Sequence, residues 1–437
     1  MGNKKPEIQY SDLYGLREEK YNWLEKHNFK TTNWQILNPR SPYYFFVPRD
    51  EKGWEIYDLF WKITDIFPVN SVGVVTGRDD FVIDFVKQPL ETRIRIFRDS
   101  PENNEFIKNA YKLKDKPASR WFVGKARDFL RKDEKWEDYF TKILYRPFDE
   151  RWIFYHPVLV ERMRENVMKN MLRQNLALMT MRQVALDLPY THFLVTDTIA
   201  EARSFLSAKG VMLYFPLYLY YETEKQKSIF TGQEKLNLRG AQHSLRVKQE
   251  KKLNISSELL GLLKNNFSQM PEPEEIFYYI YAVLYSNIYR QKYQEFLKID
   301  FPRVPITKDY KIFQRLAEIG EKLVDLHLLK SSVLQNPLAK FYGSGGGRVE
   351  TRKYEVKSKR VYINANQYFE PVEKQVWEYM IGGYQVLDKW LKDRKGRVLS
   401  TDEIKHYCRI ITTLLETIRI QKEIDKIYPE VEKSLMD

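Results

Sequence analysis

The pattern of apolar and polar positions predicts a chain that mixes helices and strands. Charged stretches, and stretches whose apolar residues recur at steps of three and four, are typical of helices. We expect helices at Tyr10–His27, Ser119–Arg131, Leu159–Arg173, Glu275–Lys298 and Tyr310–Leu329, and around a last apolar stripe from Ile404 to Ile418. Short apolar runs between turn-forming residues predict strands. These runs lie at Tyr43–Asp50, Ser71–Asp84 (two strands around a turn), Leu176–Gln183, His192–Thr196 and Val211–Tyr220.

Strands and helices do not alternate regularly along the chain, which favours an α+β fold over a parallel βαβ sheet. The middle of the chain is rich in strands, and the last part is mainly helical. We therefore expect three segments, at residues 1–115, 116–305 and 306–437, with a mixed-sheet domain followed by a helical C-terminal extension.

Charge adds a candidate partner to this picture. The chain has 437 residues, and its 72 Lys and Arg against 59 Asp and Glu give a net charge of +13. Such an excess favours a polyanionic partner, with a generally basic protein as the alternative. The 30 Tyr, 25 Phe and 9 Trp residues exclude a disordered basic tail.

Several other functional classes lack their sequence signals. The single cysteine, Cys408, excludes a disulfide framework and a cysteine zinc site within one chain, and it fits a reducing compartment such as the cytoplasm. No signal-peptide pattern and no run of 18 or more apolar residues occurs, so we expect no membrane association. The six histidines are not at metal-ligand spacings, and they are His27, His156, His192, His243, His327 and His406.

The sequence contains partial matches to catalytic motifs, but none of these motifs is complete. Asp187–Tyr190 ("DLPY") and Asn38–Tyr44 ("NPRSPYY") are each close to the Asp/Asn-Pro-Pro-aromatic loop with which adenine methyltransferases hold a flipped base. Val72–Gly77 lacks the glycine spacing of a cofactor loop. Glu355–Lys357 and Asp84–Lys87 do not complete a nuclease site, which needs further carboxylates for Mg²⁺. We therefore expect no catalytic residue and no bound cofactor or metal in this chain.

The remaining chemistry is that of nucleic-acid binding. Arginine can pair with guanine and asparagine or glutamine with adenine, while lysine neutralises phosphates. On the expected helix at Leu159–Arg173, cations and an amide share one face, and Arg182 and Gln183 follow a strand. Arg348 follows a glycine-rich loop that could approach a phosphate backbone closely. The first set of DNA-facing candidates comprises Arg151, Arg162, Asn166, Lys169, Arg173, Arg182, Gln183 and Arg348.

The stretch Leu144–Tyr155, "LYRPFDERWIFY", contributes Arg151 to that set. Pro147 and Phe148 indicate a turn, and the aromatic residues after it indicate a packed strand. Arg146 and Arg151 could each support a neighbouring carboxylate or reach a phosphate, and Arg151 is the more favoured of the two for DNA.

Several strings together resemble the C-terminal part of type ISP restriction-modification enzymes and related single-chain restriction enzyme-methyltransferases. The resemblance runs from about Tyr10 to about Tyr428. The strings, in order, are "IQYSDLYGLREEKYNWL", "YYFFVPRD", "GVVTGRDDFVIDF", "YRPFDERWIFY", "ERMRENVMKNM", "FPLYLY", "YINANQYFEPV" and "VWEYMIGGYQVLDKWLKDRKGRVLS".

This resemblance implies that residues 1–115 are the end of a methyltransferase region, and that 116–305 and 306–437 form a target-recognition domain with its helical extension. It also implies that Arg78 and Asp79, near the methyltransferase boundary, form a second DNA-facing group. S-adenosylmethionine, ATP and Mg²⁺ would belong to modules that this chain lacks. We expect the chain to recognise a double-stranded DNA sequence and to position the target adenine for a methyltransferase and nuclease that this sequence does not contain. A separate polypeptide that supplies them is one of the alternatives. The alternatives are a complete but degenerate adenine-N6 methyltransferase that uses S-adenosylmethionine, and an interaction protein that binds no DNA.

Overall fold

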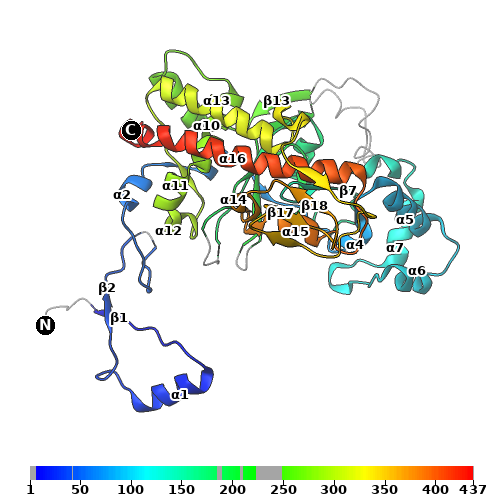
Figure 1. Ribbon diagram of the computed structural model, residues 1–437, viewed down its shortest axis with the longest axis horizontal. Helices are drawn as coiled ribbons and strands as arrows, with labels where there is room; N and C mark the ends of the chain where they lie inside the picture. The colour runs from blue at the N-terminus through cyan, green and yellow to red at the C-terminus, as the bar shows by residue number, and fades with distance from the viewer. Residues whose placement is uncertain (1–5, 42, 185–188, 207–209, 223–248, 437) are drawn as a thin grey trace. The chain divides into compact units, whose positions relative to one another are not determined.

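The computed structural model describes residues 6–41, 43–184, 189–206, 210–222 and 249–436. The chain divides into two compact units, residues 1–55 and 56–437 (Figure 1). Strands and helices are intermixed along the second unit, which confirms the predicted α+β class. The boundaries near residues 115 and 305 stay a prediction.

The first unit has little structure of its own. Strands β1 (Ile8–Tyr10) and β2 (Gln35–Leu37) pair antiparallel, and helix α1 (Arg17–Lys26) lies between them in the chain. The polar helix expected here is confirmed, although it begins seven residues later than predicted. The strand expected at Tyr43–Asp50 is wrong, because its described residues lie in turns and irregular backbone. None of the described residues of this unit is buried, so no packed core selects a strand there.

Two four-stranded sheets organise the second unit. The first has the order β10-β6-β7-β5, and the second has the order β4-β11-β8-β9. Their strands are β4 (Ser71–Val72), β5 (Ile83–Asp84), β6 (Phe140–Arg146), β7 (Asp149–Phe154), β8 (Ala177–Met181), β9 (Leu194–Thr196), β10 (Ile199–Ala200) and β11 (Met212–Pro216). All pairs in these sheets are antiparallel except β10 with β6. Strand β5, from before residue 115, therefore lies in one sheet with strands that follow it.

Smaller sheets complete the strand content. A two-stranded ribbon forms from β12 (Tyr218–Glu222) and β13 (Gln249–Leu253). A third four-stranded sheet has the order β15-β18-β17-β16. The remaining strands are β3 (Trp61–Lys62), β14 (Arg303–Val304), β15 (Lys340–Tyr342), β16 (Lys353–Glu355), β17 (Arg360–Tyr362), β18 (Tyr368–Glu370), β19 (Met380–Ile381) and β20 (Tyr384–Gln385).

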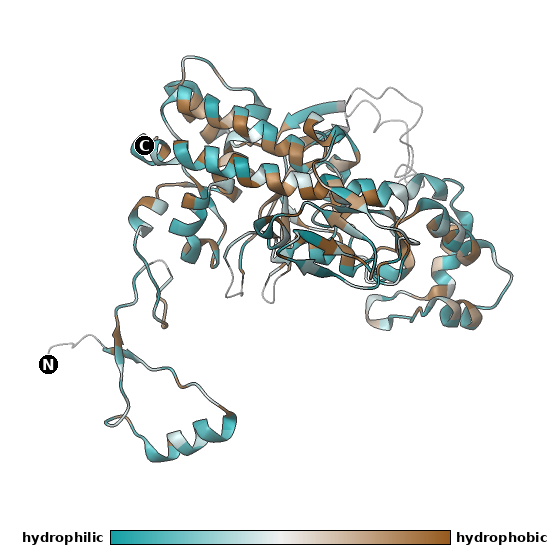
Figure 2. Ribbon diagram, in the orientation of Figure 1, coloured by the Kyte–Doolittle hydropathy of each residue, from teal (hydrophilic) through white to brown (hydrophobic). Residues whose placement is uncertain are grey.

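Helices pack beside these sheets, and the C-terminal part combines two long helices with the strands β15 to β20. The longer ones are α5 (Lys87–Asp99), α6 (Asn104–Tyr111), α7 (Val123–Lys132), α9 (Ser257–Asn266), α10 (Pro273–Tyr285), α13 (Tyr310–His327) and α16 (Thr401–Lys433). The shorter ones are α2 (Trp54–Tyr57), α3 (Ile63–Ile66), α4 (Asp79–Val82), α8 (Glu165–Met168), α11 (Asn287–Lys292), α12 (Gln294–Leu297), α14 (Lys374–Trp377) and α15 (Val386–Lys392). Helices α10, α13 and α16 pack against one another, and apolar residues are concentrated in them, whereas α1 is mostly hydrophilic (Figure 2). No described helix is both long and apolar enough to cross a membrane.

Two predicted helices differ from the structure for local reasons. The helix expected at Glu275–Lys298 is divided into α10, α11 and α12. The first break is at Ser286, which adopts an extended conformation and caps α11 with its hydroxyl, and the second is at Tyr293, whose φ of −108° and ψ of 15° depart from the helix. The amphipathic helix expected at Leu159–Arg173 is wrong. Arg164 has a φ of 58°, which a right-handed helix excludes, and only α8 and a 3₁₀ turn at Lys169–Leu172 follow it. The row of cations and amides predicted for this stretch is therefore not one helix face.

Candidate nucleic-acid interface

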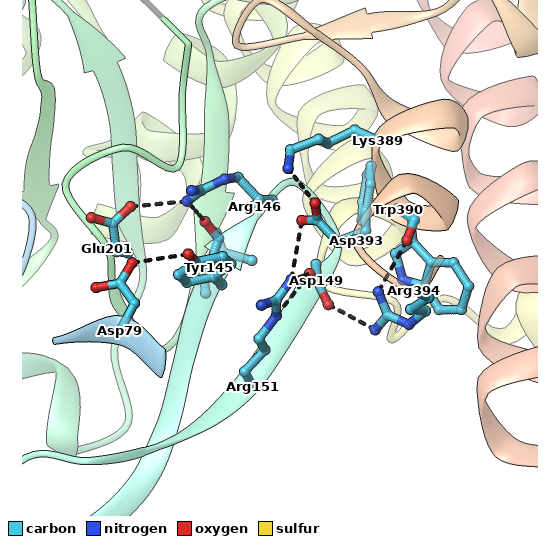
Figure 3. A network of polar contacts seen from close by, with 12 residues as sticks. Asp79, Tyr145, Arg146, Asp149, Arg151, Glu201, Lys389, Trp390, Asp393 and Arg394 are labelled. Atoms are coloured by element: carbon cyan, nitrogen blue, oxygen red, sulfur yellow. Dashed lines mark hydrogen bonds and ion pairs between the residues drawn. The ribbon is translucent and has the colours of Figure 1, made fainter. Parts of the chain in front are cut away.

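The hairpin β6–β7 contributes a buried carboxylate to a cluster of charged residues. Asp149 begins β7 with only 1% of its surface exposed. Arg151 donates to one of its oxygens from Nε at 3.0 Å and Nη2 at 2.6 Å, and Arg394 donates to the other from Nη2 at 2.8 Å (Figure 3). Burial alone would raise the pKa of Asp149, but the two guanidinium groups lower it to about 2. The carboxylate is therefore charged and fully paired at neutral pH.

Arg151 is committed to this cluster. Its Nη2 also pairs with Asp393 of the turn after α15 at 3.1 Å, and its guanidinium stacks 4.2 Å from the ring of Phe85. Lys389 is bound to the same Asp393. The side chain of Arg151 is only 11% exposed, so the structure gives it the carboxylate-supporting role that the sequence left open. Its predicted contact with DNA has no support in this geometry.

Arg78 and Asp79 also hold parts of the fold together. The guanidinium of Arg78 lies 3.5 Å from the ring centre of Trp121 and donates to the Leu159 carbonyl at 3.0 Å. Its burial lowers the pKa of Arg78. Asp79 accepts hydrogen bonds from Tyr145, at 2.9 Å, and from the Thr76 hydroxyl. Figure 3 shows this Asp79–Tyr145 contact beside the ion pair of Arg146 with Glu201 at 2.9 Å.

A different environment surrounds the candidates in α8 and directly after it. Asn166, Lys169 and Arg173 are exposed, while Asn170 and Asn175 are buried. The backbone N–H of Tyr220 donates to the Asn170 side chain at 2.8 Å, and that of Tyr218 donates to Asn175 at 3.0 Å. These two amides satisfy the free edge of β12, which would otherwise lack partners.

The pairing of β12 with this segment brings cations onto tyrosine rings. The guanidinium of Arg173 lies 5.5 Å from the ring centre of Tyr220, and the Lys251 ammonium lies 3.4 Å from that of Tyr218. Tyr220 is opposite Lys251 in the register, so these residues share one face of the ribbon. We call Arg173, Tyr218, Tyr220 and Lys251 the cation–tyrosine surface. Neither cation has a carboxylate partner within the described residues, although the Tyr218 hydroxyl donates to Glu274 at 2.6 Å.

The other predicted residues lie apart from this surface in the chain. Arg182 is 62% exposed and pairs with Asp300 at 3.3 Å, and Gln183 beside it is exposed. Arg348 is exposed and donates from Nη1 to the Gly396 carbonyl at 2.5 Å. The glycine-rich loop before Arg348 is closed by Gln367, whose side-chain oxygen accepts from the Gly347 N–H at 2.8 Å. A backbone N–H of this loop is therefore already bound to a side chain of the same protein.

The described residues of the incomplete catalytic motifs are not arranged as a base-binding loop or a cofactor loop. Asp187 and Leu188 lie outside the described residues, as does Pro42 of the second motif. Tyr190, the aromatic residue that would have to stack on a flipped base, is 1% exposed and donates to the Met181 carbonyl at 2.9 Å. Gly73 packs against the backbone of Ala202, so it does not form an open cofactor loop. Within the described ranges, no group of three or more His, Cys, Asp or Glu residues could hold a metal ion.

Sequence reasoning missed the tyrosines and the lysine of this surface. The apolar run Val211–Tyr220 gives Tyr218 and Tyr220 no role beyond a strand, and the set of DNA-facing candidates does not include Lys251. The available signal was the alternation of tyrosines in "YLYYE" together with "EKKL" further along the chain. The two buried asparagines that bind β12 gave no signal, because their partners are 43 to 50 residues away.

Comparison with known proteins identifies the class of this chain. A family model described as the Type ISP C-terminal specificity domain matches residues 65–423, so the chain belongs to that family. No curated protein sequence gives a significant match.

Solved structures share the fold at low identity. A structure described as a DrdV–DNA complex is 20% identical with a TM-score of 0.69, and the match covers 95% of this chain and 43% of that one. The Type ISP restriction-modification enzyme LlaBIII bound to DNA is 19% identical with a TM-score of 0.68, covering 93% and 26%. A nuclease-deletion mutant of the Type ISP enzyme LlaGI, with a DNA substrate mimic, is 19% identical with a TM-score of 0.62, covering 95% and 33%. The chain therefore spans less than half the length of each of these proteins.

Proposed function

We propose that this chain recognises a specific sequence in double-stranded DNA, as the specificity part of a restriction-modification enzyme. In this role it positions the target adenine for an N6-adenine methyltransferase and a nuclease. Those activities, with their S-adenosylmethionine, ATP and Mg²⁺, come from regions outside this sequence or from a separate polypeptide. The natural setting of such a system is the cytoplasm.

The observation that carries the proposal is the match of residues 65–423 to the Type ISP C-terminal specificity domain. The three related structures, which are described as bound to DNA or to a DNA mimic, support the same partner. The net charge of +13 adds the electrostatic attraction that a polyanion requires.

The cation–tyrosine surface is the part of the described chain best suited to this partner. An antiparallel two-stranded ribbon fits the major groove of duplex DNA. Arg173 and Lys251 are exposed and held on aromatic rings, so they can pair with phosphates without first breaking an ion pair. Asn166, Lys169, Arg182, Gln183 and Arg348 remain further candidates at exposed positions. Arg151, Arg78 and Asp79 instead make contacts that support the fold.

Binding to duplex DNA at increasing salt tests this function. A labelled 30-base-pair duplex is titrated with the full chain, and the association constant is followed by fluorescence anisotropy from low to physiological salt. For a DNA-binding protein, the logarithm of the association constant should fall linearly with the logarithm of the salt concentration. The slope should be about −0.9 for each phosphate that the protein neutralises. Absence of binding at low salt, or an affinity that salt does not change, would contradict the proposal.

The degenerate methyltransferase is not favoured, because the Tyr190 side chain is buried and bonded within the sheet. Titration with S-adenosylmethionine discriminates the two functions. The full chain should give no saturable binding at micromolar concentrations, and saturable binding would favour the methyltransferase.

A further inference from the structure

A helical insertion lies between β5 and β6 in the chain and contains α5, α6 and α7 (Figure 1, cyan). Lysine and arginine clearly outnumber acidic residues over positions 87–135. The segment that joins α6 to α7 has the sequence "KLKDKPASR" and comprises residues 112–120. We call it the basic loop. None of its residues belongs to the sites described above.

The basic loop is held firmly at both ends. Lys116 and Trp121 exchange backbone hydrogen bonds at 2.8 and 3.1 Å, which closes the turn between them. Leu113 is buried, and the Asp115 carboxylate accepts from the Val123 N–H at 2.8 Å. The side chains that project from the loop are therefore presented from a fixed backbone.

The loop is also attached to the segment that contains Arg162. The Trp121 indole donates to the Val158 carbonyl at 2.7 Å, and Arg78 covers its ring. Lys116 pairs with Glu161 at 2.6 Å. Gly77, with a φ of 65°, lies directly below this ion pair, where a Cβ would collide with the Glu161 carboxylate. Lys116 is the main cause of the lowered pKa of Glu161, and the charge of Arg162 also contributes to it, so Arg162 lies near the loop.

The acidic residues of this surface are already neutralised. Asp115 is paired with Lys108 at 2.6 Å, and Glu161 is paired with Lys116. Hydrogen bonding from these lysines lowers the pKa of both carboxyl groups. Four exposed cations have no ion-pair partner among the described residues, and they are Lys112, Lys114, Arg120 and Arg162.

We propose that Lys112, Lys114, Arg120 and Arg162 form a contact site for the sugar–phosphate backbone of duplex DNA. This inference rests on the proposed function and adds a surface separate from the ribbon. The basic loop contains no Asn or Gln, and lysine acts as a point charge with no fixed geometry for base edges. We expect all four side chains, the two arginines included, to pair with phosphates, so that the site adds affinity and register to any duplex.

The test replaces three of these charges while keeping side chains of similar length. The variant K112Q/K114Q/R120Q of the full chain is compared with the wild type on two labelled 30-base-pair duplexes of unrelated sequence. Each phosphate contact contributes about 0.9 to the slope of log K against the logarithm of the salt concentration. Loss of three contacts should therefore make the slope shallower by about 2 to 3 for both DNAs. The variant K311Q/R315Q/K322Q on α13 is the matched control, since Glu318, Glu321 and Asp325 balance those cations on the same helix. Its slope should be unchanged.

The outcomes separate the two proposals. A wild type that binds no DNA overturns the proposed function. A wild type that binds with a steep slope, which the loop variant keeps, overturns only the backbone contact site. The variant K112R/K114R/R120K preserves charge and should keep the wild-type slope. A loss of slope in this variant would mean that packing of the loop, and not its charge, explains the effect.

Discussion

The hairpin β6–β7 and the cation–tyrosine surface at the ribbon β12–β13 both bring cations close to aromatic residues, yet they use these cations in opposite ways. In the hairpin, Arg151 and Arg394 meet a buried carboxylate and are enclosed by the fold. At the ribbon, Arg173 beside β12 and Lys251 in β13 meet tyrosine rings and remain exposed. A cation paired with a buried acid stabilises the fold, whereas one held on an aromatic ring keeps its charge available to a ligand.

The strongest way to break this comparison is to remove the charge of Asp149. The variant Asp149→Asn preserves shape but leaves Arg151 and Arg394 facing a neutral amide in a buried site. Breaking such a pair costs about 3 to 5 kcal/mol in the free energy of unfolding, measured by urea denaturation. The exposed Asp138→Asn is the control and should cost less than about 0.5 kcal/mol. A loss below about 1 kcal/mol for Asp149→Asn would contradict the role given to the cluster.

Lowering the pH should next weaken the contribution of the hairpin's buried carboxylate, Asp149, to the stability of the fold. The pKa of Asp149 is about 2 in the folded protein and about 3.9 in an unfolded chain, so its contribution is present above pH 4 and is lost as pH falls through 2. The contribution is about 2 to 3 kcal/mol at neutral pH. The stability difference between wild type and Asp149→Asn should therefore narrow below pH 4. A difference that stays constant down to pH 2 would contradict the pairing.

Neutralising the ribbon should change binding and leave stability intact. The variant R173Q/K251Q should weaken duplex binding about tenfold at physiological salt, or about 1.4 kcal/mol. Its unfolding free energy should match the wild type within about 0.5 kcal/mol, because both residues are at the surface. Unchanged affinity would remove the cation–tyrosine surface from the proposed interface.

Exchanging arginine for lysine gives the smallest expected effects on stability and DNA affinity. The same exchange in the hairpin and beside the ribbon compares the two environments directly. Arg151→Lys loses the two donors that reach Asp149 and should cost about 1 kcal/mol or more of stability. Arg173→Lys keeps a cation over Tyr220 and should change affinity by about twofold or less. Equal effects of the two exchanges on stability would show that the two environments do not differ as described.

The sequence predicted the elements whose packing is local. Helix α13 begins at the expected residue and ends two residues early, and the turn at Pro147–Phe148 lies between β6 and β7 as expected. The apolar spacing in these stretches is sufficient, because it does not depend on distant partners.

What the sequence could not predict depends on distant partners. The sequence favoured a DNA contact for Arg151. It could not place Asp393 and Arg394 in the same cluster, because they are more than 240 residues away in the chain. The stretch around Arg173 has helical spacing, but its asparagines bind β12 and its backbone departs from the helix at Arg164. Resemblance to a family identified the class of protein, whereas tertiary contacts decide which cations remain available.

Selection from a pool of randomised duplex DNA tests the central proposal most directly. The full chain is used to retain bound duplexes over several rounds at physiological salt, and the retained DNA is sequenced. The proposal predicts one enriched motif, bound at least about a thousandfold more tightly than random duplex of the same length. Retained DNA without a common motif, bound no more tightly than the starting pool, would contradict a role in sequence recognition.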